Sequence, residues 1–116
     1  MNPKDDAARS KPSLRCMPWP AVYAIAEVLQ HGARKHRGPC DWREREREDG
    51  VRITTYLDAV LRHIAAHIEG EDLDPESGRS HLAHAAATLV IVLDAQLHGT
   101  LVDDRHAPAP AGARGF

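Results

Sequence analysis

Apolar residues recur at helical spacing in three segments of the chain. In the first segment the stripe consists of Val22, Ile25, Ala26, Leu29 and Ala33. This is the spacing of an amphipathic helix. Pro20 suits the first turn, where its missing N–H would be unpaired anyway, and Gly38-Pro39 stops the helix. We therefore expect a helix between Pro20 and Gly38.

The second segment carries the clearest helical pattern. Its apolar stripe consists of Leu57, Val60, Leu61, Ile64 and Ile68. Thr54 or Thr55 is expected to cap the helix, with Asp58 completing a capping-box-like pattern if Thr55 is the cap. Gly70 ends it.

The third segment is a helix predicted from His81 to Leu97, capped by Ser80 and stopped near Gly99. One stripe consists of Leu82, Ala86, Leu89, Leu93 and Leu97, and other apolar residues cover much of the remaining surface. A helix that is apolar nearly all round is buried on more than one side. We expect it in the centre of a bundle or across a homodimer interface.

These segments predict an all-α fold, a small helical bundle of about three main helices with short connections. The folded domain is expected to span residues 14–102. Residues 1–13 and 103–116 are expected to be flexible because they carry few apolar side chains. The charged stretch Cys40 to Gly50 is interpreted as a solvated loop or a short exposed helix, in which Trp42 packs onto a neighbour.

Composition narrows the class of protein. A net charge of −2 argues against a general nucleic-acid binder. The longest apolar run, Ala85 to Leu93, is too short to span a membrane, and no apolar leader is present. Cys16 and Cys40 lack the spacing of a zinc ribbon or redox motif. A cytoplasmic protein is expected.

Histidines form the first group of candidate site residues. His81 and His84 share a helix face opposite the leucine stripe, and buried imidazoles need partners. Those partners are a metal, a ligand, carboxylates, or an interface hydrogen-bond network. Arg62 is a candidate for a phosphate contact and His63 for a ligand or proton carrier, unless they are a surface arginine and a boundary histidine.

Charged residues form the second group of candidate site residues. Carboxylates crowd the turn before His81, and such groups either hold a hard divalent cation or stay solvated. They are Glu69, Glu71, Asp72, Asp74 and Glu76. Lys35, Trp42 and Arg43 offer cations and a ring to a nucleotide, or form an ordinary basic helix end.

Several strings of residues together resemble a known family. They are Lys11-Pro-Ser-Leu, Pro18-Trp19, His31-Gly-Ala-Arg-Lys35, Asp41-Trp42-Arg43, Tyr56 with Arg62-His63, Gly70 to Gly78, and His81-Leu-Ala-His-Ala-Ala86. The chain is similar over about Lys11 to Leu97 to the phage-type dATP/dGTP diphosphohydrolase N-terminal domain family, which is related to MazG-like all-α nucleotide pyrophosphohydrolases. The usual MazG signature, Glu-x-x-Glu followed by Glu-x-x-Asp, is absent, and His81-x-x-His84 stands where carboxylates are expected.

The resemblance implies a hydrolase that converts a purine deoxynucleoside triphosphate, dATP or dGTP, into a monophosphate and pyrophosphate with Mg²⁺ or Mn²⁺. It implies His63 and Glu71 as catalytic groups. Phosphate and base contacts fall to Lys35, Trp42, Arg43 and Arg62, and metal contacts to Glu71, Asp74, His81 and His84. The main alternative is a non-catalytic nucleotide-binding or phage accessory module with the same fold. A phosphohydrolase of the HD type ranks lower, because no His-Asp dipeptide lies on the helices.

Overall fold

The computed structural model describes residues 2–33, 38–106 and 112. Its elements in chain order are α1 (Pro3–Arg9), a 3-10 helix (Leu14–Cys16), α2 (Trp19–Ala33), α3 (Asp41–Asp49), β1 (Val51–Arg52), α4 (Ile53–Ile68), α5 (His81–His98) and β2 (Leu101–Val102). The predicted all-α class is broadly confirmed, since the two-residue strands are the only sheet in this part of the chain.

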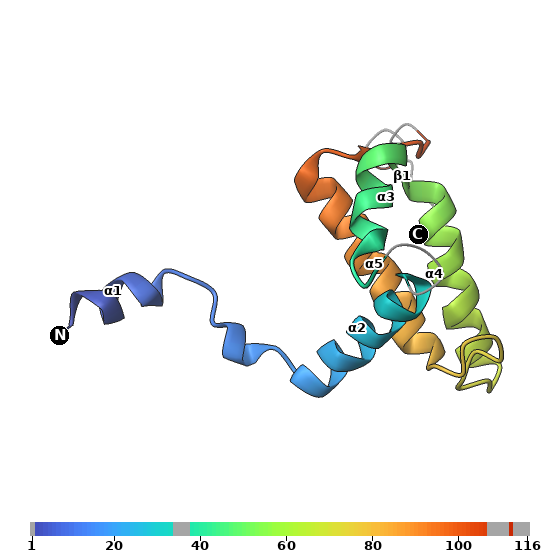
Figure 1. Cartoon of the computed structure of the whole chain (residues 1–116), viewed down its shortest axis with the longest axis horizontal. Coiled ribbons are helices and arrows are strands. Elements are labelled where there is room, and N and C mark those ends of the chain that lie inside the picture. Colours follow the sequence, from blue (N-terminus) through green and yellow to red (C-terminus); the bar gives the residue numbers. More distant parts are fainter. Residues whose placement is uncertain (1, 34–37, 107–111, 113–116) are drawn as a thin grey trace.

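The prediction of about three main helices was too low, because α1 and α3 also form. Neither helix carries an apolar stripe, so hydrophobic periodicity could not reveal them. α1 is set by its N-terminus, where the Asn2 side chain accepts the N–H of Lys4 and Pro3 occupies the first turn. It buries no residue and extends away from the other helices as an arm (Figure 1).

Helices α4 and α5 form the central antiparallel pair, and α2 and α3 pack on α5 (Figure 1). At one end of the pair, β1 and β2 join the start of α4 to the end of α5, with Val51 opposite Leu101. Gly50 precedes this junction with φ +77°, and a Cβ there would meet Val102 Cγ2 at 3.2 Å and the Thr100 carbonyl at 3.3 Å. Glycine is therefore strongly favoured at this position.

The two predicted helix caps have different outcomes. Ser80 caps α5 as expected, because its side chain accepts from the N–H groups of Leu82 and Ala83. Thr54 and Thr55 do not cap α4, which begins at Ile53 after Arg52. The Asp104 carboxylate instead accepts from the Thr54 N–H at 3.1 Å and its hydroxyl at 2.6 Å, so a residue distant in sequence supplies the missing acceptor.

The described core is small and consists largely of short side chains. Alanines 83, 85, 87 and 95 of α5 are buried together with Val51, Ile53 and Val60. The leucine stripe of α5 faces outward instead, with Leu93 54% and Leu97 75% exposed. The prediction that α5 is central is met, but its buried side is the alanine side, because small residues let neighbouring helices approach closely.

Charged residues link α3 to α5. Glu46 is only 4% exposed and its carboxyl group hydrogen-bonds Asp94 of α5. Arg43 Nη2 lies 3.2 Å from Asp94 Oδ1. Of the two predicted alternatives for this segment, a solvated loop or a short exposed helix, the helix forms, but the expected exposure is wrong, since Asp41 and Glu46 are buried.

No helix among the described residues is both long and apolar enough to cross a bilayer.

Candidate functional site

Three imidazoles from two helices meet at the end of the α4–α5 pair opposite the strands. His63 projects from the last two turns of α4, and His81 and His84 from the first turn of α5. The Nδ1 atoms of His63 and His81 are 2.9 Å apart. The His63 and His84 rings are stacked, with centroids 4.6 Å apart and planes 8° from parallel. The structure thus brings together the histidines that the sequence singled out.

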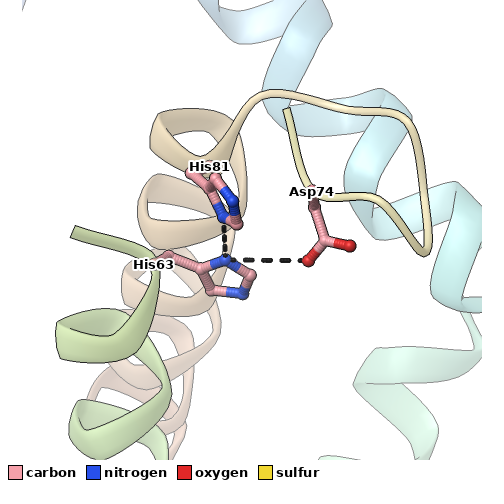
Figure 2. A group of neighbouring side chains, drawn as sticks. All are labelled: His63, Asp74 and His81. Atoms are coloured by element: carbon pink, nitrogen blue, oxygen red, sulfur yellow. Dashed lines mark hydrogen bonds and ion pairs between the residues drawn. The ribbon is translucent and has the colours of Figure 1, made fainter. Parts of the chain in front are cut away.

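His81 is held by contacts to both of its ring nitrogens. Its Nε2 lies 2.7 Å from Glu71 Oε1, and the residue is only 5% exposed. An ionised carboxylate only accepts, so Nε2 carries the hydrogen and donates it. In the neutral ring Nδ1 is then an acceptor, and this atom faces His63 Nδ1 (Figure 2).

Asp74 reaches the same point from the loop between α4 and α5. Its Oδ2 lies 3.9 Å from His63 Nδ1 (Figure 2). Its Oδ1 accepts the N–H groups of Glu76 at 2.8 Å and Ser77 at 3.3 Å, the pattern of an Asx-turn. The loop is closed by the Asp74 N–H to Arg79 carbonyl bond of 2.8 Å. One oxygen therefore shapes the loop while the other faces the imidazoles.

His84 is held by a hydroxyl group. Its Nε2 lies 2.6 Å from Ser77 Oγ, which also accepts the Arg79 N–H at 3.1 Å. With the Arg79 N–H already occupying an acceptor position, the Ser77 hydroxyl is free to donate to His84 Nε2. This contact and the stack on His63 fix the plane of the His84 ring.

The surroundings of His63, His84 and Asp74 shift the pKa of each of these side chains. Burial lowers the pKa of His63 and of His84, and the neighbouring imidazoles lower each further, against the opposing effect of Asp74. Burial alone would raise the pKa of Asp74, but the two N–H groups of the Asx-turn and the imidazoles outweigh it and lower this pKa. Near neutral pH the site therefore presents neutral His63 and His84 beside an ionised Asp74.

A pocket of about 290 Å³ opens beside the cluster. It is lined by Val28, His31, Gly32, His63, Asp74, Glu76, Ser77 and His84. His31 and Ser77 were not among the predicted site residues. Both residues stand in strings that carry the family resemblance, and this was the signal in the sequence that could have identified them. His31 lies on α2, and the packing of α2 on α5 brings it to the pocket.

The donor set fits a divalent metal ion. His63, Asp74 and His81 each offer one ligand atom, and these atoms all lie within 4.8 Å of one another. Imidazole nitrogen and carboxylate oxygen are common ligands of such ions. Glu71 contacts the far nitrogen of His81, and His84 bonds Ser77, so neither predicted ligand belongs to this three-atom group.

The predicted phosphate and base contacts are dispersed. Arg62 is exposed on α4 beside His63. Arg43 pairs with Asp94 and lies 5.7 Å from the Trp42 ring centroid. Asp94 is ten residues after His84 on α5, about 15 Å along the axis, so Trp42 and Arg43 do not line the pocket. Lys35 lies outside the described residues.

Comparison with known proteins agrees with the resemblance. A relative, the dATP/dGTP diphosphohydrolase of Salmonella phage PMBT28, is 35% identical over 81 residues, which are 70% of this chain and 26% of that protein. The chain thus spans about a quarter of the length of the curated relative that it matches. No solved structure matches it. A family model described as dATP/dGTP diphosphohydrolase, N-terminal, matches residues 1–105. The chain therefore belongs to the dATP/dGTP diphosphohydrolase N-terminal family.

Proposed function

We propose that this chain provides the helical domain of a metal-dependent pyrophosphohydrolase that converts dATP or dGTP into the monophosphate and pyrophosphate. The observation that carries the proposal is the pocket beside the imidazole cluster, in which His63, Asp74 and His84 border one open volume. The family and the printed name of the phage relative supply the substrate class.

A divalent ion would be held by His63, Asp74 and His81. When bound, such an ion supplies positive charge to phosphate oxygens and lowers the pKa of water. Glu71, which the sequence predicted as a metal ligand and catalytic group, would act through His81 by fixing its ring.

The remaining residues of the pocket can move a proton. A neutral imidazole accepts a proton from an attacking water, and burial keeps His84 neutral near pH 7. Ser77 lines the pocket and bonds His84 Nε2. We assign Ser77 and His84 Nε2 as the proton path, with His63 stacked on His84 to hold its plane.

Cations near the pocket would stabilise the charge that develops on the departing pyrophosphate. Among the residues that the structure describes, Arg62 is the candidate for this cation, because it is exposed and precedes His63 in the sequence. Lys35 follows Gly32, a pocket residue, by three positions in the sequence and remains a predicted phosphate contact. Arg43 is already paired with Asp94, so its predicted phosphate role requires that this pair break.

Product analysis tests the proposal. The protein is incubated with dGTP or dATP and Mg²⁺, Mn²⁺ or Co²⁺, and nucleotides are separated while pyrophosphate is measured. We expect equal amounts of monophosphate and pyrophosphate, and loss of both in His81→Ala. His98→Ala is the matched control, because His98 lies at the far end of the same helix, where its ring contacts Asp94.

Two results would reject the enzyme. Tripolyphosphate or inorganic phosphate as product would indicate another reaction. Nucleotide binding without turnover in any of the ions would favour a non-catalytic binding module, the main alternative.

We also propose that two copies associate through α5. Four leucines of this helix are exposed at positions 82, 89, 93 and 97, and with Ala86 they follow a spacing of four, three, four and four residues. This spacing forms a seam suited to a second copy of the same helix. Burying that seam would compensate for the small core of a single copy.

Light scattering after size-exclusion chromatography measures the mass directly. We expect a dimer for the unaltered chain, a monomer for Leu93→Glu, and a dimer for Gln96→Glu, which adds the same charge beside the seam. A monomeric unaltered chain at tens of micromolar, or a dimer that persists in Leu93→Glu, would reject this interface.

A further inference from the structure

The imidazole cluster carries information about which ion the site selects. The distance of 2.9 Å between His63 Nδ1 and His81 Nδ1 is too short for two uncoordinated lone pairs, so a proton or a cation must lie between them. Two nitrogens bound at ~2.0–2.1 Å to one ion at a right angle lie ~2.9 Å apart. The pair therefore has the separation of adjacent ligands on one ion.

Asp74 offers the third ligand atom, and the three ligand atoms lie within 4.8 Å of one another. Its Oδ2 is 3.9 Å from His63 Nδ1, which is below the ~4.1 Å that separates two ligands on opposite sides of one such ion. The Asx-turn holds this carboxylate through its other oxygen, so the free oxygen is preorganised (Figure 2). The ligand set is thus two nitrogens and one oxygen.

Glu71 supplies the second observation that points to a metal. Ligating histidines commonly donate their other ring N–H to a carboxylate, which fixes the tautomer and strengthens the ligand. Glu71 takes this place at 2.7 Å from His81 Nε2. The resulting tautomer leaves His81 Nδ1 unprotonated, as a metal ligand requires, and the same lone pair can accept a hydrogen from His63 Nδ1 when it holds no ion.

The two nitrogens decide the class of ion. Mg²⁺ prefers an octahedral set of oxygens and binds proteins through carboxylates and water, whereas imidazole suits Co²⁺, Ni²⁺ and Zn²⁺. We propose that His63, His81 and Asp74 form a site for a nitrogen-preferring divalent transition ion, with Glu71 as the group that orients His81, and that Mg²⁺ does not replace this ion. The role of the ion in hydrolysis rests on the proposed function, whereas the geometry of the ligand site is independent of the reaction.

Cobalt provides a direct probe without nucleotide. The metal-free full chain is titrated with Co²⁺ and followed by visible absorption and by calorimetry. We expect one ion per chain, bands characteristic of nitrogen coordination, displacement by equimolar Zn²⁺, and no displacement by Mg²⁺ in thousandfold excess. Binding of Mg²⁺ in competition with Co²⁺ at comparable concentrations would overturn the proposal.

Variants identify the ligands. Asp74→Asn keeps the oxygen that forms the Asx-turn, and His81→Gln and His63→Gln keep polar side chains of similar size. Each variant should lose the visible absorption bands of bound Co²⁺. Circular dichroism verifies that each variant is folded. Glu71→Gln should weaken Co²⁺ binding about tenfold to hundredfold, as expected for an orienting group. His98→Ala should bind as the unaltered chain does.

The outcomes separate the ion site from the enzyme. Co²⁺ binding that survives in His63→Gln and His81→Gln, or that is lost equally in His98→Ala, refutes the site. If a ligand variant does not fold, the band positions of the unaltered chain still decide between nitrogen and oxygen coordination. Nitrogen-coordinated Co²⁺ without pyrophosphate release would support the ion site and reject the proposed function. Pyrophosphate release by Asp74→Asn with Mg²⁺ alone would support the proposed function and reject the ion site.

Discussion

Replacement of Glu46 by glutamine should stabilise the protein at neutral pH. Glu46 is buried between α3 and α5, and its pKa is raised from 4.5 to about 7 by burial, by the hydrogen bond with Asp94 and by the charge of Asp94, against the opposing effects of Arg43 and Arg47. A raised pKa means that the folded chain keeps a proton that the unfolded chain has released. Between pH 4.5 and 7 folding therefore takes up a proton, and stability falls as pH rises.

The size of the effect follows from the shift. A change of about 2.5 pKa units corresponds to roughly 3 kcal/mol, present in full below pH 4.5 and lost once pH exceeds about 7. The amide of Glu46→Gln can donate to Asp94 as a protonated acid does, without this pH dependence. The variant should match the unaltered chain near pH 4.5 and exceed its unfolding free energy by up to about 3 kcal/mol at pH 8.

Urea unfolding followed by circular dichroism from pH 4.5 to 8 measures this difference. Because the histidine cluster is unchanged by the substitution, its titration cancels when the two chains are compared. Glu44→Gln removes an exposed carboxylate from the same helix and is the matched control for the loss of one negative charge. The reasoning fails if the Glu46→Gln difference is flat with pH, or if it has the opposite slope.

Three further substitutions probe the junctions that hold the site. Gly50→Ala should cost about 1–3 kcal/mol of unfolding free energy in urea, because φ is +77° and the added Cβ meets Val102 and Thr100; an unchanged midpoint would contradict the close approach. Ser80→Ala removes the cap of α5 and should cost about 1 kcal/mol by the same measurement, whereas Ser10→Ala in the exposed arm should cost far less. Ser77→Ala should leave Co²⁺ binding intact and slow pyrophosphate release about threefold to tenfold, the kinetic equivalent of a hydrogen bond worth ~0.5–1.5 kcal/mol, and an unchanged rate would remove Ser77 from the proton path.

Hydrophobic periodicity predicted those parts of the fold that bury an apolar side. It located α2, α4 and α5 because their packing depends on spaced apolar residues, and the Ser80 cap followed from local chemistry. It could not reveal α3, whose buried groups Asp41 and Glu46 are charged and find their partners only in the folded chain. It predicted that α5 is buried on more than one side, but it could not show that the alanines would face the neighbouring helices while the leucines stay exposed.

The candidate site was partly predictable for a related reason. His81 and His84 are adjacent on one helix turn, so their common face follows from spacing. The approach of His63 depends on the antiparallel pairing of α4 and α5, which are consecutive main helices of the chain. The places of Glu71 and Asp74 depend instead on which loop oxygen bonds which backbone N–H group, and no residue spacing specifies that choice.

The two ends of the α4–α5 pair have different roles, since one joins the helices and the other carries the histidine cluster. The strands, Gly50 and the Asp104 contact lie where α4 begins and α5 ends, and the histidine cluster lies where α4 ends and α5 begins. A helix is stiff along its axis, so tightening the first end restricts the crossing of the helices and hence the distance between His63 and His81. Because a metal ion tolerates only a few tenths of an ångström in ligand position, changes at the strand junction should lower Co²⁺ affinity although no residue there touches the ion. Equal Co²⁺ affinity in Gly50→Ala and in the unaltered chain, measured well below the unfolding midpoint, would show instead that the α4–α5 loop alone sets the site.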